Sequence, residues 1–294
     1  MPVQIPDDSD HQVLRDAVRA LCARFDGAYW RQIDEARGYP EAFANALTQA
    51  GWLAALIPEE YGGSGLGLTE ASIVMEEINR SGGNSGAVHG QMYNMSTLLR
   101  AGSKAQKAQY LPRIAAGELR LQSMAVTEPT TGTDTTKLKT TATRSGDRFI
   151  LNGQKVWTSR VQHSDLMLVL ARTTPLDLVK KKSDGLSVFL VDIHVALKTG
   201  MTVRPIRNMV NHETNEVFFD ELEIPAENLI GEQDKGFRII LAGLNAERVL
   251  IAAECVGDAY CSSTRPRPMQ VIASCSTVRS AATRASSSRS RAPM

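Results

Sequence analysis

The chain has 294 residues, which is enough for about two domains of ordinary size. Hydrophobic residues make up 43% of it and charged residues 22%, as in typical globular proteins. The net charge of +1 argues against a nucleic-acid partner, and no apolar run reaches the roughly 20 residues that cross a bilayer. The acidic first residues resemble neither a signal nor a transit peptide.

The first third of the chain has the apolar spacing of amphipathic helices. Residues 11–25 place Val13, Val18 and Leu21 on one helical stripe. Similar patterns occur over residues 40–51, 69–80, 87–101 and 104–116. No alternating strand pattern appears before about residue 121, so we predict an N-terminal α-helical domain over residues 1–120.

The pattern then changes to short β-rich runs separated by turn residues. The runs are Leu121–Thr127, Thr136–Thr143, Phe149–Trp157, Leu166–Ala171, Leu186–Asp192 and Glu216–Phe219. Their length and spacing predict a middle domain over residues 121–233, built as an antiparallel β sandwich or barrel.

A helical pattern returns at Gly236 and runs to Tyr260, with Phe237, Ile240 and Leu244 on one face. We therefore predict a single helical element over residues 234–260, one apolar face of which has nothing to pack against. Residues 261–294 are rich in Ser, Arg, Ala and Thr and have no sustained periodicity, which predicts an aberrant, disordered tail.

Neither the cysteines nor the histidines have the spacing of metal ligands. The cysteines are Cys22, Cys255, Cys261 and Cys275. We expect no metal site and a reducing, cytoplasmic compartment.

Several motifs occur along the chain in a defined order. They are Ile57-Pro58-Glu59-Glu60-Tyr61-Gly62-Gly63, Met124-Ala125-Val126-Thr127-Glu128-Pro129, Gly132-Thr133-Asp134 and Leu151-Asn152-Gly153-Gln154-Lys155-Val156-Trp157. In sequence and order they resemble the acyl-CoA dehydrogenase family, and the likeness covers residues 11–260. The resemblance implies an α+β multidomain fold with an N-terminal helical bundle, a middle β domain and only the first helix of a C-terminal helical domain. It also implies FAD as cofactor.

The resemblance assigns flavin contacts to the strand that ends at Pro129. Met124, Val126 and Thr127 would contact the isoalloxazine ring, and Thr133 would reach the flavin phosphates and the bound acyl-CoA. Read from the residues alone, this segment is equally an ordinary β-turn with a satisfied threonine.

The segment Trp157-Thr158-Ser159 resembles the family's tryptophan–X–hydroxyl motif. The indole would cover a face of the flavin, Thr158 would lie beside it, and the Ser159 hydroxyl would bond near N5. The alternative is a core tryptophan at a strand end.

A general base is expected on the last helix. Glu247 matches the position used by isovaleryl- and long-chain-type members, where a glutamate precedes the arginine, here Arg248. Burial beside an apolar acyl chain would raise its pKa. Asn245 and Arg248 would bind the substrate on its CoA side. The alternatives are an exposed helix charge at Glu247 and a surface ion pair at Arg248.

The function implied is α,β-dehydrogenation of an acyl-CoA thioester, in which a carboxylate takes the α-proton and the flavin accepts the β-hydrogen as hydride. The implied partners are an electron-transferring flavoprotein and, in complete members, further copies of the chain; in a eukaryote the implied location is the mitochondrial matrix. Two alternatives stay open: a flavin oxidase or monooxygenase of the same fold, and an inactive, pseudogene-like remnant.

The tail lacks the C-terminal segment of complete family members. Reading codons permitted by residues 261–292 in a shifted frame yields family-like strings, which suggests a one-base deletion just after Tyr260. A natural splice or lineage-specific tail is the alternative. A truncated, frameshifted chain of this kind is expected to bind flavin weakly and to have little or no activity.

Overall fold

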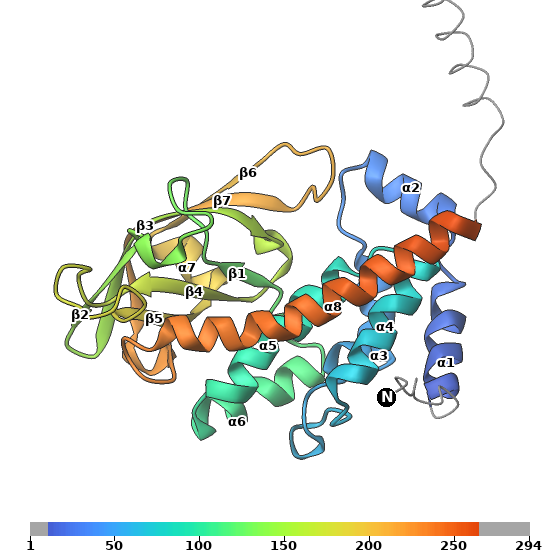
Figure 1. Cartoon of the computed structure of the whole chain (residues 1–294), viewed down its shortest axis with the longest axis horizontal. Helices are drawn as coiled ribbons and strands as arrows, with labels where there is room; N and C mark the ends of the chain where they lie inside the picture. Colours follow the sequence, from blue (N-terminus) through green and yellow to red (C-terminus); the bar gives the residue numbers. More distant parts are fainter. Residues whose placement is uncertain (1–10, 265–294) are drawn as a thin grey trace, which may run out of the picture.

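The computed structural model of the protein describes residues 11–264. Helices occupy one side of the molecule and a β-sheet the other, and the long C-terminal helix α8 (Gly236–Thr264) runs along both (Figure 1). This arrangement confirms the predicted order of a helical part, a β part and one further helix. No helix within residues 11–264 combines the length and apolarity that a membrane crossing requires.

Periodic apolar residues account for most of the N-terminal helices. These are α1 (Gln12–Cys22), α2 (Gly27–Glu35), α3 (Glu41–Gln49), α4 (Leu68–Arg80), α5 (Gly86–Ala101) and α6 (Lys104–Ala115). Helix α2 was not predicted from periodicity, because none of its residues is buried. It is instead fixed by Asp26, whose carboxylate accepts hydrogen bonds from the backbone N–H groups of Ala28 and Tyr29.

The β part is an eight-stranded sheet in the order β6-β7-β3-β2-β4-β5-β8, with β1 added beside β4. The strands are β1 (Ser123–Ala125), β2 (Thr141–Ser145), β3 (Arg148–Ser159), β4 (Leu166–Arg172), β5 (Leu186–Asp192), β6 (Met201–Pro205), β7 (Thr214–Pro225) and β8 (Leu229–Ile230); the short helix α7 (Ile193–Thr199) follows β5. Among the described strands, β1–β4 and the single pair Thr141–Arg172 are parallel. The sheet is therefore mixed rather than wholly antiparallel.

The two halves of the sheet pack face to face, which gives the predicted sandwich its core. Phe149 of β3 meets Phe189 of β5 edge-on at 4.9 Å between ring centroids. Val169 of β4, Val217 of β7 and Ala142 of β2 belong to the same buried cluster.

Strand β4 is buried on both faces. Met167, Val169 and Ala171 point into the sandwich, whereas Leu166, Leu168 and Leu170 join a second buried cluster with residues of the helices. Strand β5 alternates in the same way from Leu186 to Val191. These two strands therefore connect the β core to the helical core.

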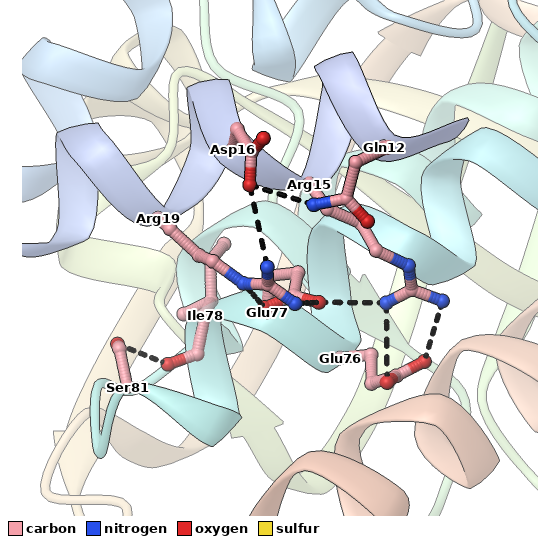
Figure 2. A network of polar contacts seen from close by, with 8 residues as sticks. All are labelled: Gln12, Arg15, Asp16, Arg19, Glu76, Glu77, Ile78 and Ser81. Carbon is pink, nitrogen blue, oxygen red and sulfur yellow. Dashed lines mark hydrogen bonds and ion pairs between the residues drawn. The ribbon is translucent and has the colours of Figure 1, made fainter. Parts of the chain in front are cut away.

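A buried carboxylate joins α1 to α4. Glu77 is 1% exposed, and it accepts hydrogen bonds from Arg15 Nη1 at 2.7 Å and from Arg19 Nε at 2.7 Å. Figure 2 shows Arg15 of α1 reaching Glu76 and Glu77 of α4, and Arg19 reaching Glu77 and its neighbour Asp16. Two guanidinium groups compensate the desolvation of one buried charge and fix the position of α1.

Helix α8 lies close to α5 and α4 because glycine occupies its contact points. A Cβ at Gly243 would lie 2.7 Å from Thr97 Oγ1 of α5, and a Cβ at Gly257 would lie 2.3 Å from the carbonyl oxygen of Glu76 on α4. The helix continues past Tyr260, where the sequence pattern predicts its end, to Thr264. The rest of the expected tail lies outside the described residues.

Several apolar residues of α8 are exposed, namely Leu241, Val249, Ile251, Val256 and Tyr260. The exposed polar residues Asn245 and Arg248 lie among them. These exposed apolar residues favour self-association.

The close approach at Gly257 predicts that Gly257→Ala destabilises the protein. Helix propensity alone would favour alanine by about 1 kcal/mol, but the added Cβ would push against the α4 backbone, and overpacking costs about 1–3 kcal/mol. We expect a lower thermal unfolding midpoint. Ala252→Gly, at an exposed position of the same helix, measures propensity alone. A more stable Gly257→Ala protein would contradict the close packing of α8 on α4.

Candidate functional site

Two of the sequence motifs meet at one side of the sheet. Met124 on β1 pairs with Leu168 on β4, and the loop that follows β1 turns toward β3. The backbone N–H of Val156 donates to the carbonyl oxygen of Thr127 at 2.9 Å. The structure thus brings residues 124–129 beside residues 155–159.

A buried ion pair fixes this meeting point. Lys155 is fully buried, and its Nζ lies 2.9 Å from Glu128 Oε1 and 3.0 Å from the carbonyl oxygen of Val126. Glu128 also accepts hydrogen bonds from the backbone N–H groups of Lys139 and Thr140. Burial raises the pKa of a carboxyl group, but Lys155 and these N–H groups hold the pKa of Glu128 below its ordinary value. Burial lowers the pKa of Lys155 to about 8.

Trp157 stands out from the end of β3. Its backbone has a left-handed φ of 62°, and the residue is 59% exposed although tryptophan is highly buried on average. The strand register shifts between Lys155 and Thr158, which turns the indole outward. A strained backbone that exposes a large aromatic side chain indicates a functional position.

The neighbours of Trp157 differ in burial. Thr158 is 1% exposed, and its Oγ1 has no hydrogen-bond partner within the described chain. Ser159 is half-buried at the strand end. Met124 and Val126 are half-buried against the helix–sheet core, and Thr127 is also half-buried.

Thr133 is exposed, in the bend that follows Thr131. No hydrogen bond between described residues connects it with the other predicted flavin contacts. Its contact with the flavin phosphates stays a prediction.

Glu247 lies on α8 and faces α5. Its side chain is 25% exposed. Burial raises the pKa of Glu247 above its ordinary value, although His89 and Arg248 oppose the shift. Asn245 and Arg248 are exposed, and Arg248 Nη1 donates to Asn245 Oδ1 at 2.7 Å.

Four residues around Glu247 and the facing part of α5 were not identified from the sequence, namely His89, Tyr93, Arg160 and Glu254. His89 Nδ1 lies 2.8 Å from Glu254 Oε1, and His89 Nε2 lies 3.9 Å from Glu247 Oε1. Burial raises the pKa of Tyr93 to about 12, with Arg160 and Glu247 within electrostatic range. Arg160 follows Ser159 in a left-handed conformation, and its guanidinium lies over Gly86 and Gly90 of α5.

A signal for two of the missed residues was present in the sequence. Gly86, His89, Gly90 and Tyr93 have the spacing of one helix face. Arg160 could not have been found in this way, because its placement depends on the turn after β3.

The group at the sheet edge fits a flat aromatic cofactor. It combines a half-buried apolar wall at Met124 and Val126, the exposed indole of Trp157 and the hydroxyl groups of Thr127 and Ser159. Within residues 11–264, no cluster of His, Cys, Asp and Glu has the arrangement of a metal site.

Two family models match the chain. The acyl-CoA dehydrogenase N-terminal domain matches residues 8–118, and the acyl-CoA dehydrogenase middle domain matches residues 123–222. The chain belongs to the acyl-CoA dehydrogenase family. Its members are enzymes of the oxidoreductase class.

Individual members of the acyl-CoA dehydrogenase family resemble the chain over most of its length. Cyclohex-1-ene-1-carbonyl-CoA dehydrogenase of Syntrophus aciditrophicus (strain SB) is 33% identical over 85% of this chain and 60% of its own length. Mitochondrial isovaleryl-CoA dehydrogenase of Pongo abelii is 34% identical over 73% of this chain and 51% of its own length. The structure of a glutaryl-coenzyme A dehydrogenase–glutaryl-CoA complex aligns with a TM-score of 0.77 and 30% identity, over 87% of this chain and 65% of that one. The chain thus spans between half and two thirds of these relatives.

Because Lys155 bonds both Glu128 and the carbonyl oxygen of Val126, we predict that Lys155→Met weakens the packing of residues 124–129 against residues 155–159. Removing one partner of a buried ion pair costs about 3–5 kcal/mol, so we expect a lower thermal midpoint and less flavin retained on purification. Lys137→Met is the matched control, because Lys137 pairs with Asp134 at 3.1 Å on the surface. If both variants retain wild-type stability and flavin content, the buried pair does not hold these two segments together.

The raised pKa of Glu247 predicts a stability cost at neutral pH. A carboxyl group whose pKa is higher in the folded state stabilises the fold fully below its ordinary pKa, and that contribution is lost as the pH rises through the folded-state pKa. Glu247→Gln should therefore unfold at a higher temperature than wild type at about pH 7, with the difference vanishing below about pH 4. Glu232→Gln, on the exposed loop before α8, should show no such pattern.

Proposed function

We propose that the chain has the site for flavin-dependent α,β-dehydrogenation of an acyl-CoA thioester, with Glu247 as the base that removes the α-proton, and that it performs this reaction at a low rate because it binds flavin weakly. The observation that carries the proposal is the half-buried Glu247 carboxylate on α8, which faces α5. It occurs in a chain in which residues 124–129 and 155–159, the proposed flavin contacts, lie side by side. Helix α8 and the segment that carries Val126 pack on one core, because Leu244 of α8 and Val126 both contact the same buried cluster.

The residues at the sheet edge would hold the cofactor, which we propose to be FAD. Met124, Val126 and Trp157 would contact the flat ring system, and the hydroxyl groups of Thr127 and Ser159 would donate hydrogen bonds to it. Thr158 and Thr133 are the more peripheral members of the set. A bound flavin would supply the two-electron acceptor that the β-hydrogen needs.

Glu247 would act through its local electrostatics. A base must be ionised to accept a proton, and a carboxylate whose pKa is raised toward neutrality accepts protons from carbon acids more readily than an ordinary one. Burial supplies the rise, while His89 and Arg248 keep the ionised form accessible. Asn245 and Arg248, at the exposed side of the helix, would contact the polar CoA part of the substrate.

The partners follow from the same chemistry. A flavin held here would need an acceptor for its two electrons, and we propose an electron-transferring flavoprotein as that acceptor. We also propose that the family's self-association occurs in complete chains and that the protein acts in the cytoplasm, or in the mitochondrial matrix of a eukaryote.

Anaerobic spectroscopy tests this proposal. The purified protein, supplied with FAD, is titrated with straight, branched and cyclic acyl-CoA thioesters while its visible flavin absorbance is recorded. We expect bleaching by at least one thioester, and a loss of about 10²–10⁴-fold in its rate in Glu247→Gln, with wild-type rates in Glu232→Gln.

The same titration separates the alternatives. A protein that binds flavin but is bleached by none of the thioesters would contradict dehydrogenation. Rapid oxygen consumption after bleaching would indicate an oxidase of the same fold. A chain that binds no flavin would favour an inactive remnant.

A further inference from the structure

A histidine links two carboxylates between α5 and α8. Glu247 and Glu254 lie two helical turns apart on one face of α8. His89 of α5 lies opposite both, with Nδ1 2.8 Å from Glu254 Oε1 and Nε2 3.9 Å from Glu247 Oε1. The side chains are 12% exposed for His89, 17% for Glu254 and 25% for Glu247, so solvent screens this chain of charges only partly.

The short contact fixes the tautomer of the imidazole. An ionised carboxylate only accepts hydrogen bonds, so His89 Nδ1 must donate to Glu254. The proton that His89 gains or loses therefore resides on Nε2, the nitrogen that faces Glu247. At 3.9 Å this second contact is an electrostatic pairing rather than a hydrogen bond.

The surroundings hold the ring in place. The Tyr93 ring packs edge-on against His89 at 5.1 Å between centroids. The other charged groups near Glu247 and Tyr93 are Arg248, on α8 itself, and Arg160, at the turn after β3. Of these groups, only His89 contacts both carboxylates.

We propose that His89 is a positioning residue for Glu247: anchored by Glu254, it presents Nε2 to the Glu247 carboxylate, and its protonated form holds that carboxylate ionised and in one orientation for proton abstraction. This inference rests on the proposed function of Glu247. It assigns Glu254 the task of orienting the histidine, in the way that a third group orients a general base in catalytic triads.

The first test is a titration that does not depend on catalysis. Side-chain resonances of isotopically labelled histidines are followed against pH by NMR in wild type, Glu247→Gln and Glu254→Gln. Loss of either negative charge should move the His89 midpoint to lower pH. His194, which pairs with Asp165 at 2.8 Å on the exposed helix α7, should titrate identically in all three proteins. An unchanged His89 midpoint in Glu247→Gln overturns the proposal.

The second test is the pH profile of thioester-dependent flavin reduction. In His89→Gln, which keeps an amide donor for Glu254 but cannot titrate, the rising limb should move to higher pH, with a rate about tenfold lower below the midpoint. His194→Gln should match wild type, and a His89→Gln profile that superimposes on wild type overturns the proposal.

The two tests separate this inference from the proposed function. A His89 midpoint that moves in Glu247→Gln, in a protein that reduces no flavin, would contradict the proposed dehydrogenation and support the His89–Glu247 pairing. Uncoupled resonances in an active protein would overturn the pairing alone.

Discussion

The structure depends on the burial of strands β4 and β5 on both faces. Leu166, Leu168 and Leu170 face the helices while Met167 and Val169 face the sandwich, so a single strand belongs to both cores. Neither core is complete without it, because removing these side chains from water is the main favourable contribution on each side. Helix α8 begins against this shared layer, with Phe237 and Ile240 in the same cluster as Leu168, and its direction along α5 and α4 follows from that start. The position of Glu247 opposite His89 is thus a consequence of how β4 and β5 are covered.

The elements that sequence periodicity identified are those with one buried face. Helices α4, α5 and α6 and strands β3, β4 and β5 agree with their expected ranges within a few residues. The elements missed have other causes. Helix α2 buries no residue and is fixed by its Asp26 cap, α7 is a single short helix, and β6 is an edge strand whose Arg204 and Pro205 hide its alternation. The parallel placement of β1 beside β4 could not be read from either strand, because register is a property of the assembled sheet.

For the candidate site, motifs predicted which segments matter but not how they are held. The hydrogen bond between Val156 and Thr127 brings the two motifs together, and their contacts with a flavin stay a prediction. Lys155 occupies a buried position of strand β3, and a charged residue at such a position indicates an ion pair, here with Glu128. The role of His89 cannot be read from local sequence, because its carboxylate partners are more than a hundred residues away and lie on another helix. Long-range pairings of this kind come from tertiary packing, which local patterns do not encode.

The exposed position of Trp157 makes its fluorescence sensitive to what binds at this surface. Of the three tryptophans, Trp30 and Trp52 are partly buried against the helical core, whereas Trp157 stands exposed on a strained stretch of backbone. The emission of an indole depends on the polarity around it and is quenched by an aromatic acceptor placed against it. Because Trp157 lies beside the place where residues 124–129 and 155–159 meet, its fluorescence responds to what approaches that surface. Occupation of this surface can therefore be followed by intrinsic fluorescence, without a label and in the unmodified chain.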